Sequence, residues 1–167
     1  MRLQHKVSII TGGGQGIGRA TCLKFAQEGS RVAVCDINRI PADETAAAIH
    51  DAGGEALAFE VDVTDKASIA RMVEAVMAAW GRIDTLVNNA GIVQDARLAK
   101  MTDEQFERVV DVNLKGVYNC TKAVVDIMLA QNSGCILNAS SIVGLHGNFG
   151  QTNYAATKFA VIGMMKT

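Results

Sequence analysis

The sequence predicts an α/β fold in which helices cover both faces of a doubly wound parallel sheet. Two observations lead to this prediction. Short runs rich in Val and Ile alternate with segments of helical length along the whole chain, and a glycine-rich stretch directly follows the first run. Strands joined by helical crossovers run parallel to one another. The 167 residues are therefore predicted to form a single domain, 1–167.

The first half of the chain contains four predicted strands. They are short apolar runs with the composition of buried strands: 7–11, 31–36, 55–63 and 83–89. The segments between them have helical length and end at glycines: 16–29, 41–54 and 66–80. Pro41 is expected at the start of the second helix, where a missing N–H costs little.

The second half of the chain begins with one long predicted helix, 102–130, which Thr102 and Gln105 start with a capping box. A fifth strand follows over 134–140, and then a helix that carries Tyr154. The chain reaches Thr167 inside that helix, without a helix-stop signal. We therefore expect the C-terminal strands of the doubly wound order to be missing and the chain to be a fragment of a longer protein.

Composition excludes several classes of protein. Hydrophobic residues make up 49% and charged residues 20%, and the net charge of -1 argues against nucleic-acid binding. No apolar run is long enough to cross a membrane, and no signal-peptide pattern is present. The histidines share no metal-ligand spacing, and the scattered cysteines are expected to be free buried thiols: Cys22, Cys35, Cys120 and Cys135. We expect a cytoplasmic protein without a metal.

The stretch TGGGQGIG, 11–18, predicts a phosphate site. Gly12, Gly16 and Gly18 allow a tight turn and let a pyrophosphate approach the N-terminus of the next helix, where free N–H groups favour negative charge. The spacing is GxxxGxG, not the commoner GxGxxG, and glycine-rich turns also serve plain helix–strand packing. Its position between a strand and a helix favours the dinucleotide interpretation.

Two aspartates at strand ends extend this site. Asp36 lies about twenty residues after the glycines, where a carboxylate accepts hydrogen bonds from ribose hydroxyls and repels a 2′-phosphate. NAD(H) is therefore predicted in preference to NADP(H), although Arg39 would weaken the exclusion and Asp36 alone would suit a turn. Asp62 is expected either to meet the adenine amino group or to cap the next helix.

Tyr154 and Lys158 are one helical turn apart and project together. Free tyrosine titrates near pH ~10, and a nearby cation favours the phenolate, which suits a group that exchanges protons with a substrate oxygen. Ser141, at the end of the fifth strand, is placed to hydrogen-bond the same oxygen. On its own, however, a YxxxK pair is best explained as a helix surface pair.

In combination, TGGGQGIG, NNAG (88–91), Asn113, Ser141 and YAATK (154–158) resemble the short-chain dehydrogenase/reductases over the whole chain. The resemblance implies that Tyr154 is the acid/base, that Ser141, in preference to Ser140, polarises the substrate oxygen, and that Asn113 holds a relay water. Lys158 would bind the nicotinamide ribose and tune Tyr154. The implied cofactor contacts also include Gly12, Gln15, Gly16, Ile17, Gly18, Asp36, Asp62, Val63, Asn89, Ala90 and Gly91.

Within that family the segment 140–163 most resembles 3-oxoacyl-[acyl-carrier-protein] reductases and their NAD-linked relatives. This implies an NAD(H)-dependent oxidoreductase that interconverts a ketone, for example a 3-oxoacyl thioester, and a secondary alcohol, and that forms a homodimer or homotetramer. His146 and Phe149 either line the substrate pocket or pack as ordinary loop residues. Two other interpretations remain open: a truncated, non-catalytic dinucleotide-binding relative, and an epimerase or dehydratase of the same superfamily.

Overall fold

Five parallel strands form one sheet, in the order β3-β2-β1-β4-β5. The computed structural model describes all residues, 1–167. The strands are β1 (Val7–Thr11), β2 (Arg31–Asp36), β3 (Ala56–Glu60), β4 (Thr85–Asn88) and β5 (Cys135–Asn138). All five are predicted strands, and three are shorter than predicted, because 55–63, 83–89 and 134–140 include loop residues at their ends. The predicted doubly wound sheet is confirmed.

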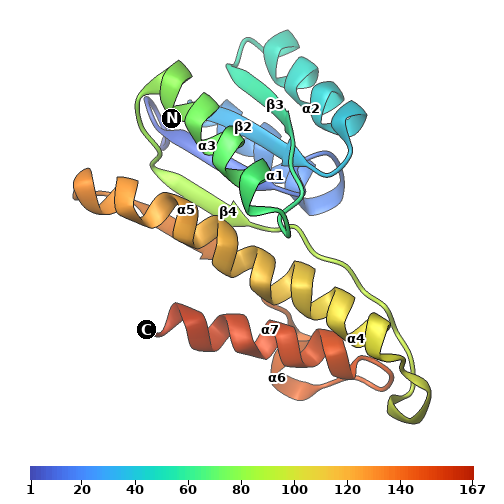
Figure 1. Cartoon of the computed structure of the whole chain (residues 1–167). Helices are drawn as coiled ribbons and strands as arrows, with labels where there is room; N and C mark the ends of the chain where they lie inside the picture. The colour runs from blue at the N-terminus through green and yellow to red at the C-terminus, as the bar shows by residue number, and fades with distance from the viewer.

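Helices cover both faces of the sheet (Figure 1). One side is formed by α1 (Gly16–Gln27) and α2 (Arg39–Asp51), and the other by α3 (Lys66–Trp80) and α5 (Gly116–Ala130). Alternate residues of each strand enter separate cores, so Val7 and Ile9 of β1 pack toward α3 and α5, whereas Ile10 packs toward α1 and α2. This alternation is why the central strands are apolar along their whole length.

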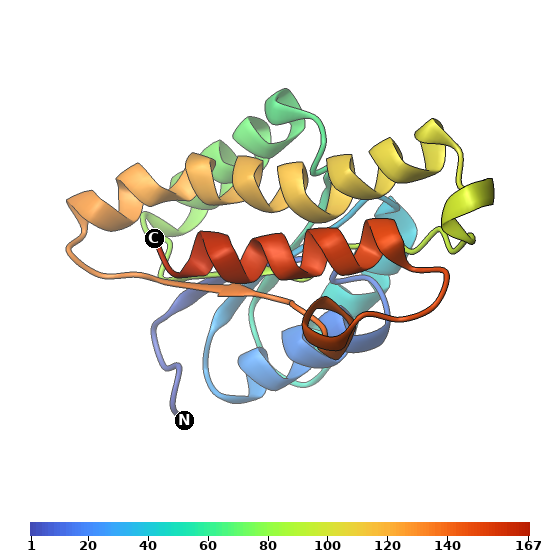
Figure 2. The same cartoon turned by 90° about the horizontal axis from the view of Figure 1, so that it is seen from below.

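The remaining helices build the wall beside the carboxyl end of the sheet. They are η1 (Leu98–Lys100), α4 (Asp103–Val110), η2 (Asp111–Lys115), α6 (Ile142–His146) and α7 (Thr152–Met165). Seen from below, α7 runs alongside the α4–α5 segment and over β5 (Figure 2). The short helix α6 was not predicted from the sequence, since five residues carry too little periodicity to be recognised.

The long predicted helix 102–130 is not one regular α-helix. It contains a π-helical turn, η2, between α4 and α5, and Asn113 lies in the middle of that turn. The predicted capping box is present, because Thr102 Oγ1 accepts from Gln105 N and the Gln105 side chain accepts from Thr102 N. A π-helical turn inside an α-helix is often found at functional sites.

Two further expectations are wrong in detail. Helix α2 begins at Arg39, so Pro41 is its third residue and not its first. This is tolerated because the N–H groups of the first turn have no partner within the helix. Cys22, Cys35 and Cys120 are buried free thiols, but Cys135 is exposed because it lies on β5, where fewer side chains cover the sheet.

Candidate active site

The glycine-rich loop joins β1 to α1 and adopts a conformation that side chains would disturb. Gly12 and Gly16 have positive φ angles of 65° and 54°. A Cβ atom added to Gly18 would collide with the carbonyl oxygen of Gly12. The loop therefore needs glycine at these positions, as the sequence predicted.

The loop presents free backbone donors. Helix α1 has no side-chain cap at Gln15, and none of the N–H groups of residues 15–18 has a hydrogen-bond partner within the protein. Four unpaired donors at the positive end of a helix dipole form a site for an anion such as a pyrophosphate. The residues present thus fit the phosphates of a dinucleotide.

Asp36 fastens this loop to the end of β2. Its Oδ2 accepts a hydrogen bond from Gly14 N at 3.0 Å, and its Oδ1 accepts from Asn38 N at 3.0 Å. Asp36 therefore stabilises the turn after β2, as one of the two interpretations expected. Its side chain also lines the cavity in front of the glycine-rich loop. A carboxylate has about four acceptor positions, so two remain for ribose hydroxyls.

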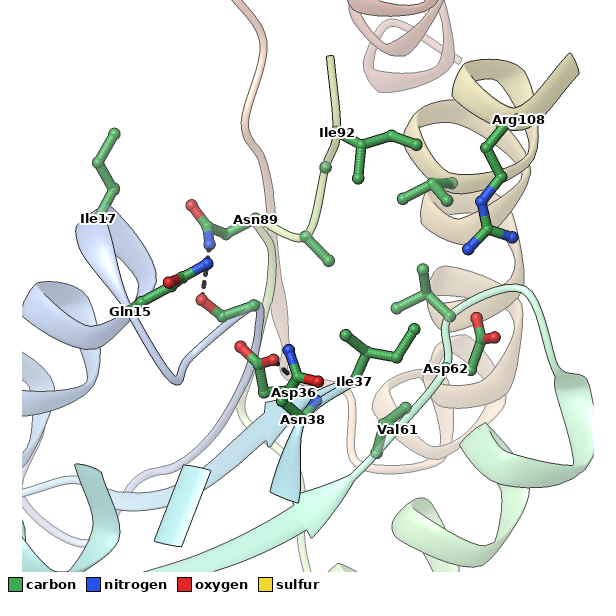
Figure 3. Close-up of a pocket in the computed structure, with 15 residues that line it drawn as sticks. Gln15, Ile17, Asp36, Ile37, Asn38, Val61, Asp62, Asn89, Ile92 and Arg108 are labelled. Atoms are coloured by element: carbon green, nitrogen blue, oxygen red, sulfur yellow. Dashed lines mark hydrogen bonds between the residues drawn. The ribbon is translucent and has the colours of Figure 1, made fainter. Parts of the chain in front are cut away.

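A cavity of about 380 Å³ lies at the carboxyl ends of the strands (Figure 3). Nine predicted cofactor residues line it: Gly12, Gln15, Ile17, Asp36, Asp62, Val63, Asn89, Ala90 and Gly91. Asp62 accepts from Thr64 N at 2.8 Å and from Thr64 Oγ1 at 2.7 Å, whereas Asp65 caps α3. The expectation that Asp62 caps this helix is therefore wrong. Asp62 instead lies in the lining of the cavity.

The sequence interpretation missed several lining residues. They are Ile37, Asn38, Val61, Ile92, Arg108 and Val112. Arg108 and Val112 are four apart, as expected for one face of a helix, but nothing in the sequence indicated that this face meets the glycine loop. They reach the cavity because the bonds between Asn113 and Ile92 hold η2 beside the segment that follows NNAG.

Asn89 and Thr11 hold the second wall of the cavity in place. The Thr11 hydroxyl accepts hydrogen bonds from the backbone N–H groups of Asn89 and Ala90, each at 3.1 Å. The Asn89 amide donates in return to the carbonyl oxygens of Thr11 and Gly12, at 3.0 and 3.2 Å. The NNAG segment is thereby bonded directly to the start of the glycine-rich loop.

Asn113 is completely buried and is bonded to the segment that follows NNAG. Its side-chain oxygen accepts from Ile92 N at 2.8 Å, and its amide nitrogen donates to Ile92 O at 2.9 Å. The side chain thus ties η2 to the cavity wall. The relay water proposed for Asn113 remains a prediction.

Lys158 lies on α7 with only 5% of its surface exposed. Its Nζ donates to the carbonyl oxygen of Ala139 at 2.5 Å and lies 5.6 Å from the centre of the Tyr154 ring. Burial lowers the pKa of Lys158, since an ammonium group loses hydration there. A Cβ built on Gly91 would lie 3.7 Å from this Nζ, so the lysine reaches the rim of the cavity.

The two serines after β5 have different partners. Ser140 Oγ donates to the Lys158 carbonyl oxygen at 2.7 Å, so its proton is committed to the backbone of α7. Ser141 Oγ accepts from Val143 N at 3.2 Å as the N-cap of α6, which leaves its own O–H free to donate. The choice of Ser141 over Ser140 stays a prediction, and of the two serines only Ser141 has a hydroxyl proton without an acceptor.

His146, the last residue of α6, and Phe149, in the loop that follows, are both exposed, and neither lines the cavity. The guanidinium of Arg97 lies 5.7 Å from the centre of the Phe149 ring. No group of three His, Cys, Asp or Glu side chains is arranged to hold a metal ion. None of the helices combines the length and the apolar character needed to span a membrane.

These features define an α/β protein with a glycine-rich loop and a cavity at the carboxyl end of its parallel sheet, and comparison with known proteins specifies the family. The family model described as short chain dehydrogenase matches residues 6–167. The chain therefore belongs to the short-chain dehydrogenase family, whose members are nicotinamide-dependent oxidoreductases acting on CH–OH and ketone groups.

Similar proteins include 3-oxoacyl-[acyl-carrier-protein] reductases. The enzyme FabG of Thermotoga maritima is 50% identical over all of this chain and 68% of its own length. The 3-oxoacyl-[acyl-carrier-protein] reductase of Synechocystis sp. is 43% identical over 99% of this chain and 67% of its own length. The crystal structure of a short chain dehydrogenase from Mycobacterium avium superposes with a TM-score of 0.93 at 36% identity, over 98% of this chain and 62% of the other. The chain thus spans about two thirds of these relatives.

Proposed function

We propose that the protein to which this chain belongs reduces a 3-oxoacyl thioester to the 3-hydroxyacyl thioester with NADH. The observation that carries the proposal is the position of Lys158, which is buried on α7, 5.6 Å from the Tyr154 ring and beside Gly91 of the cavity. The thioester class is supported by the names of the similar 3-oxoacyl-[acyl-carrier-protein] reductases. A cytoplasmic location is part of the proposal, and the absence of disulfides among the four cysteines suits it.

The cofactor would supply the hydride that reaches the carbonyl carbon. The Tyr154 phenol donates its proton to the carbonyl oxygen, so that the ketone becomes a secondary alcohol. Lys158 stabilises the negative charge that develops on the phenol oxygen and also contacts the cofactor ribose. Ser141 donates its free hydroxyl proton in a hydrogen bond to the same substrate oxygen, which orients the carbonyl for reaction.

The proposed preference for NADH rests on Asp36. Its carboxylate lines the cavity at the end of β2, and no lysine or arginine among the lining residues comes from the glycine-rich loop or from β2. A 2′-phosphate placed there would face a negative charge. Arg39, which was expected to weaken this exclusion, is paired with Asp43 at 2.8 Å.

The experiment is to follow NADH and NADPH oxidation with a 3-oxoacyl thioester and with simple ketones, and to identify the product. We expect higher kcat/KM with NADH, and a narrowed or reversed preference in Asp36→Ala. Asp36→Asn serves as the matched variant because it retains an acceptor for Gly14 N while removing the charge. Equal kcat/KM for both cofactors in the unmodified protein contradicts the NADH preference. Dinucleotide binding without turnover of any carbonyl compound contradicts the proposed reaction and favours a non-catalytic binding protein.

A further inference from the structure

Arg108 stands out among the residues of the cavity. It is the only lysine or arginine in the lining, where the other charged residues are Asp36 and Asp62. Its side chain is exposed and takes part in no salt bridge or side-chain hydrogen bond. In Figure 3 the guanidinium extends from α4 into the cavity, on the wall opposite Gln15 and Ile17. A free cation directed into a ligand cavity needs an explanation.

The two ends of the cavity differ in chemistry. The end at the glycine-rich loop offers the unpaired N–H groups of residues 15–18, which suit phosphates. On the side of Arg108, Figure 3 shows the apolar side chains of Ile37 and Val61 together with the carboxylate of Asp62. Val63 and Val112 also line the cavity, and Val112 follows Arg108 by one helical turn. An apolar wall that faces a planar cation suits a flat aromatic ring, because guanidinium groups stack on the faces of such rings.

We propose that Arg108 binds the adenine ring of the dinucleotide by stacking its guanidinium on the ring face. The inference rests on the proposed use of a dinucleotide cofactor, but it needs no catalysis. The pyrophosphate is already served by the N–H groups across the cavity, so the Arg108 charge is not required there. Asp36, at the end of β2, binds the hydroxyl groups of the ribose that lies between the pyrophosphate and the adenine. Arg108 thereby determines affinity for the adenosine half of the cofactor.

The test is to measure dissociation constants by fluorescence or calorimetry for four ligands: NADH, NADPH, ADP-ribose and reduced nicotinamide mononucleotide. Arg108→Ala is expected to weaken NADH, NADPH and ADP-ribose equally, by roughly tenfold, as a cation–π contact would. Binding of the mononucleotide, which lacks adenine, should not change. Arg108→Lys retains the charge but not the planar face, and it should recover less than half of the lost affinity on a logarithmic scale.

Arg71→Ala is the matched control. It removes the same charge from an exposed position on α3 that does not line the cavity, and its weak contact to Asp65 spans 4.0 Å. It should leave all four dissociation constants within twofold. Thermal unfolding of both alanine variants checks that the fold is retained, which is expected because both side chains are exposed.

Several outcomes would overturn the proposal. Unchanged NADH affinity in Arg108→Ala means that the guanidinium does not touch the cofactor. A loss confined to NADPH identifies a 2′-phosphate contact instead, and full recovery in Arg108→Lys identifies a contact of charge alone. If the unmodified protein binds no dinucleotide, the cofactor assignment fails together with this inference. If it binds dinucleotides normally but turns over no carbonyl compound, only the proposed reaction fails.

Discussion

The two buried charged side chains Lys158 and Asp84 differ in their hydrogen-bond partners. Lys158 has one backbone carbonyl as its hydrogen-bond acceptor, and burial lowers its pKa. Asp84 accepts from Lys6 Nζ, from Val7 N and twice from Arg82, at distances between 2.6 and 3.0 Å. Burial alone would raise the pKa of Asp84, but the bonds from Arg82, Val7 and Lys6 outweigh it and lower the pKa to about 2. Asp84 is thus neutralised by two cations, whereas Lys158 has no carboxylate partner.

Replacement of Tyr154 by Phe should separate proton transfer from cofactor binding. The ring still packs on α7, so NADH binding should stay within about twofold, whereas kcat should fall by at least roughly a hundredfold. Lys158→Met should weaken NADH binding as well, because it removes a cation at the rim of the cavity. Titration with NADH and initial rates on a protein that includes any further C-terminal sequence provide the measurement. If Tyr154→Phe keeps most of its activity, Tyr154 is not the acid/base of the reaction.

Asp84 predicts a pH dependence of stability. Its pKa is about 2 in the folded state and lies below the reference value of 3.8. The ionised form therefore contributes stability above about pH 4, roughly 2 kcal/mol in size, and this contribution is lost as the pH falls toward 2. Asp84→Asn should lower the free energy of unfolding at pH 7 and flatten its decline between pH 4 and pH 2.

Urea unfolding at pH 7, 4 and 3 measures this effect. Asp43→Asn is the control, since Asp43 is exposed and paired only with Arg39 one turn away, so its loss should change stability by less than about 0.5 kcal/mol. Equal pH slopes for Asp84→Asn and the unmodified protein would show that the Asp84 cluster does not stabilise the fold.

Among the elements, α7 depends on one buried side chain. Asn153 is fully buried, and its amide donates to the carbonyl oxygens of Gln94 and Gln105, at 3.0 and 3.1 Å. Its oxygen accepts from Tyr154 N at 2.7 Å. A single residue thereby joins the start of α7 to α4 and to the loop that follows NNAG.

Asn153→Ala should destabilise the protein by roughly 2 kcal/mol, because the carbonyl groups of Gln94 and Gln105 lose the hydrogen bonds from a fully buried amide. The loss of stability should be largest near the start of α7. Relative to the unmodified protein, the backbone amides of residues 152–158 should therefore gain more in their rate of exchange with deuterium than those of β1. Gln151→Ala is the matched control, since its bond to Asp95 at 2.9 Å lies at the surface. Equal exchange rates in Asn153→Ala and Gln151→Ala would contradict the prediction that the hydrogen bonds of Asn153 stabilise the start of α7.

At the scale of the whole molecule, large apolar side chains remain on the outer faces of α5 and α7. Tyr118 is 52% exposed, Leu129 68% and Phe159 61%, whereas Val117, Val124 and Met128 of α5 are buried. Helix α5 thus carries apolar residues on more than one face. Outer apolar faces of this kind commonly pack against another subunit.

We predict that the protein is a homodimer or homotetramer. Light scattering at micromolar concentration should give at least twice the monomer mass. Tyr118→Glu together with Phe159→Glu should shift the protein toward the monomer, because buried, unpaired carboxylates oppose association. A monomer in the unmodified protein at that concentration would rule the prediction out.

The sequence by itself determined the order of strands and helices, the glycine-rich loop and the fold class. These follow from local causes: β-branched runs, helical periodicity, and glycines where the backbone needs positive φ angles, as at Gly12 and Gly16. The family resemblance then indicated nine residues that do line the cavity. Strand ends were less certain, because only pairing with a neighbour shows where a ladder stops.

Only the tertiary structure decided which side chains meet. It placed Arg108 and Val112 opposite the glycine-rich loop, turned the Ser140 hydroxyl toward α7, and made Asn153 a bond between three segments. It also inserted the π-helical turn at Asn113, where the side chain bonds Ile92 across the cavity wall. These contacts join residues far apart in the chain. Local sequence propensity does not predict them, because they arise from the packing of α4, η2 and α7 in the tertiary structure.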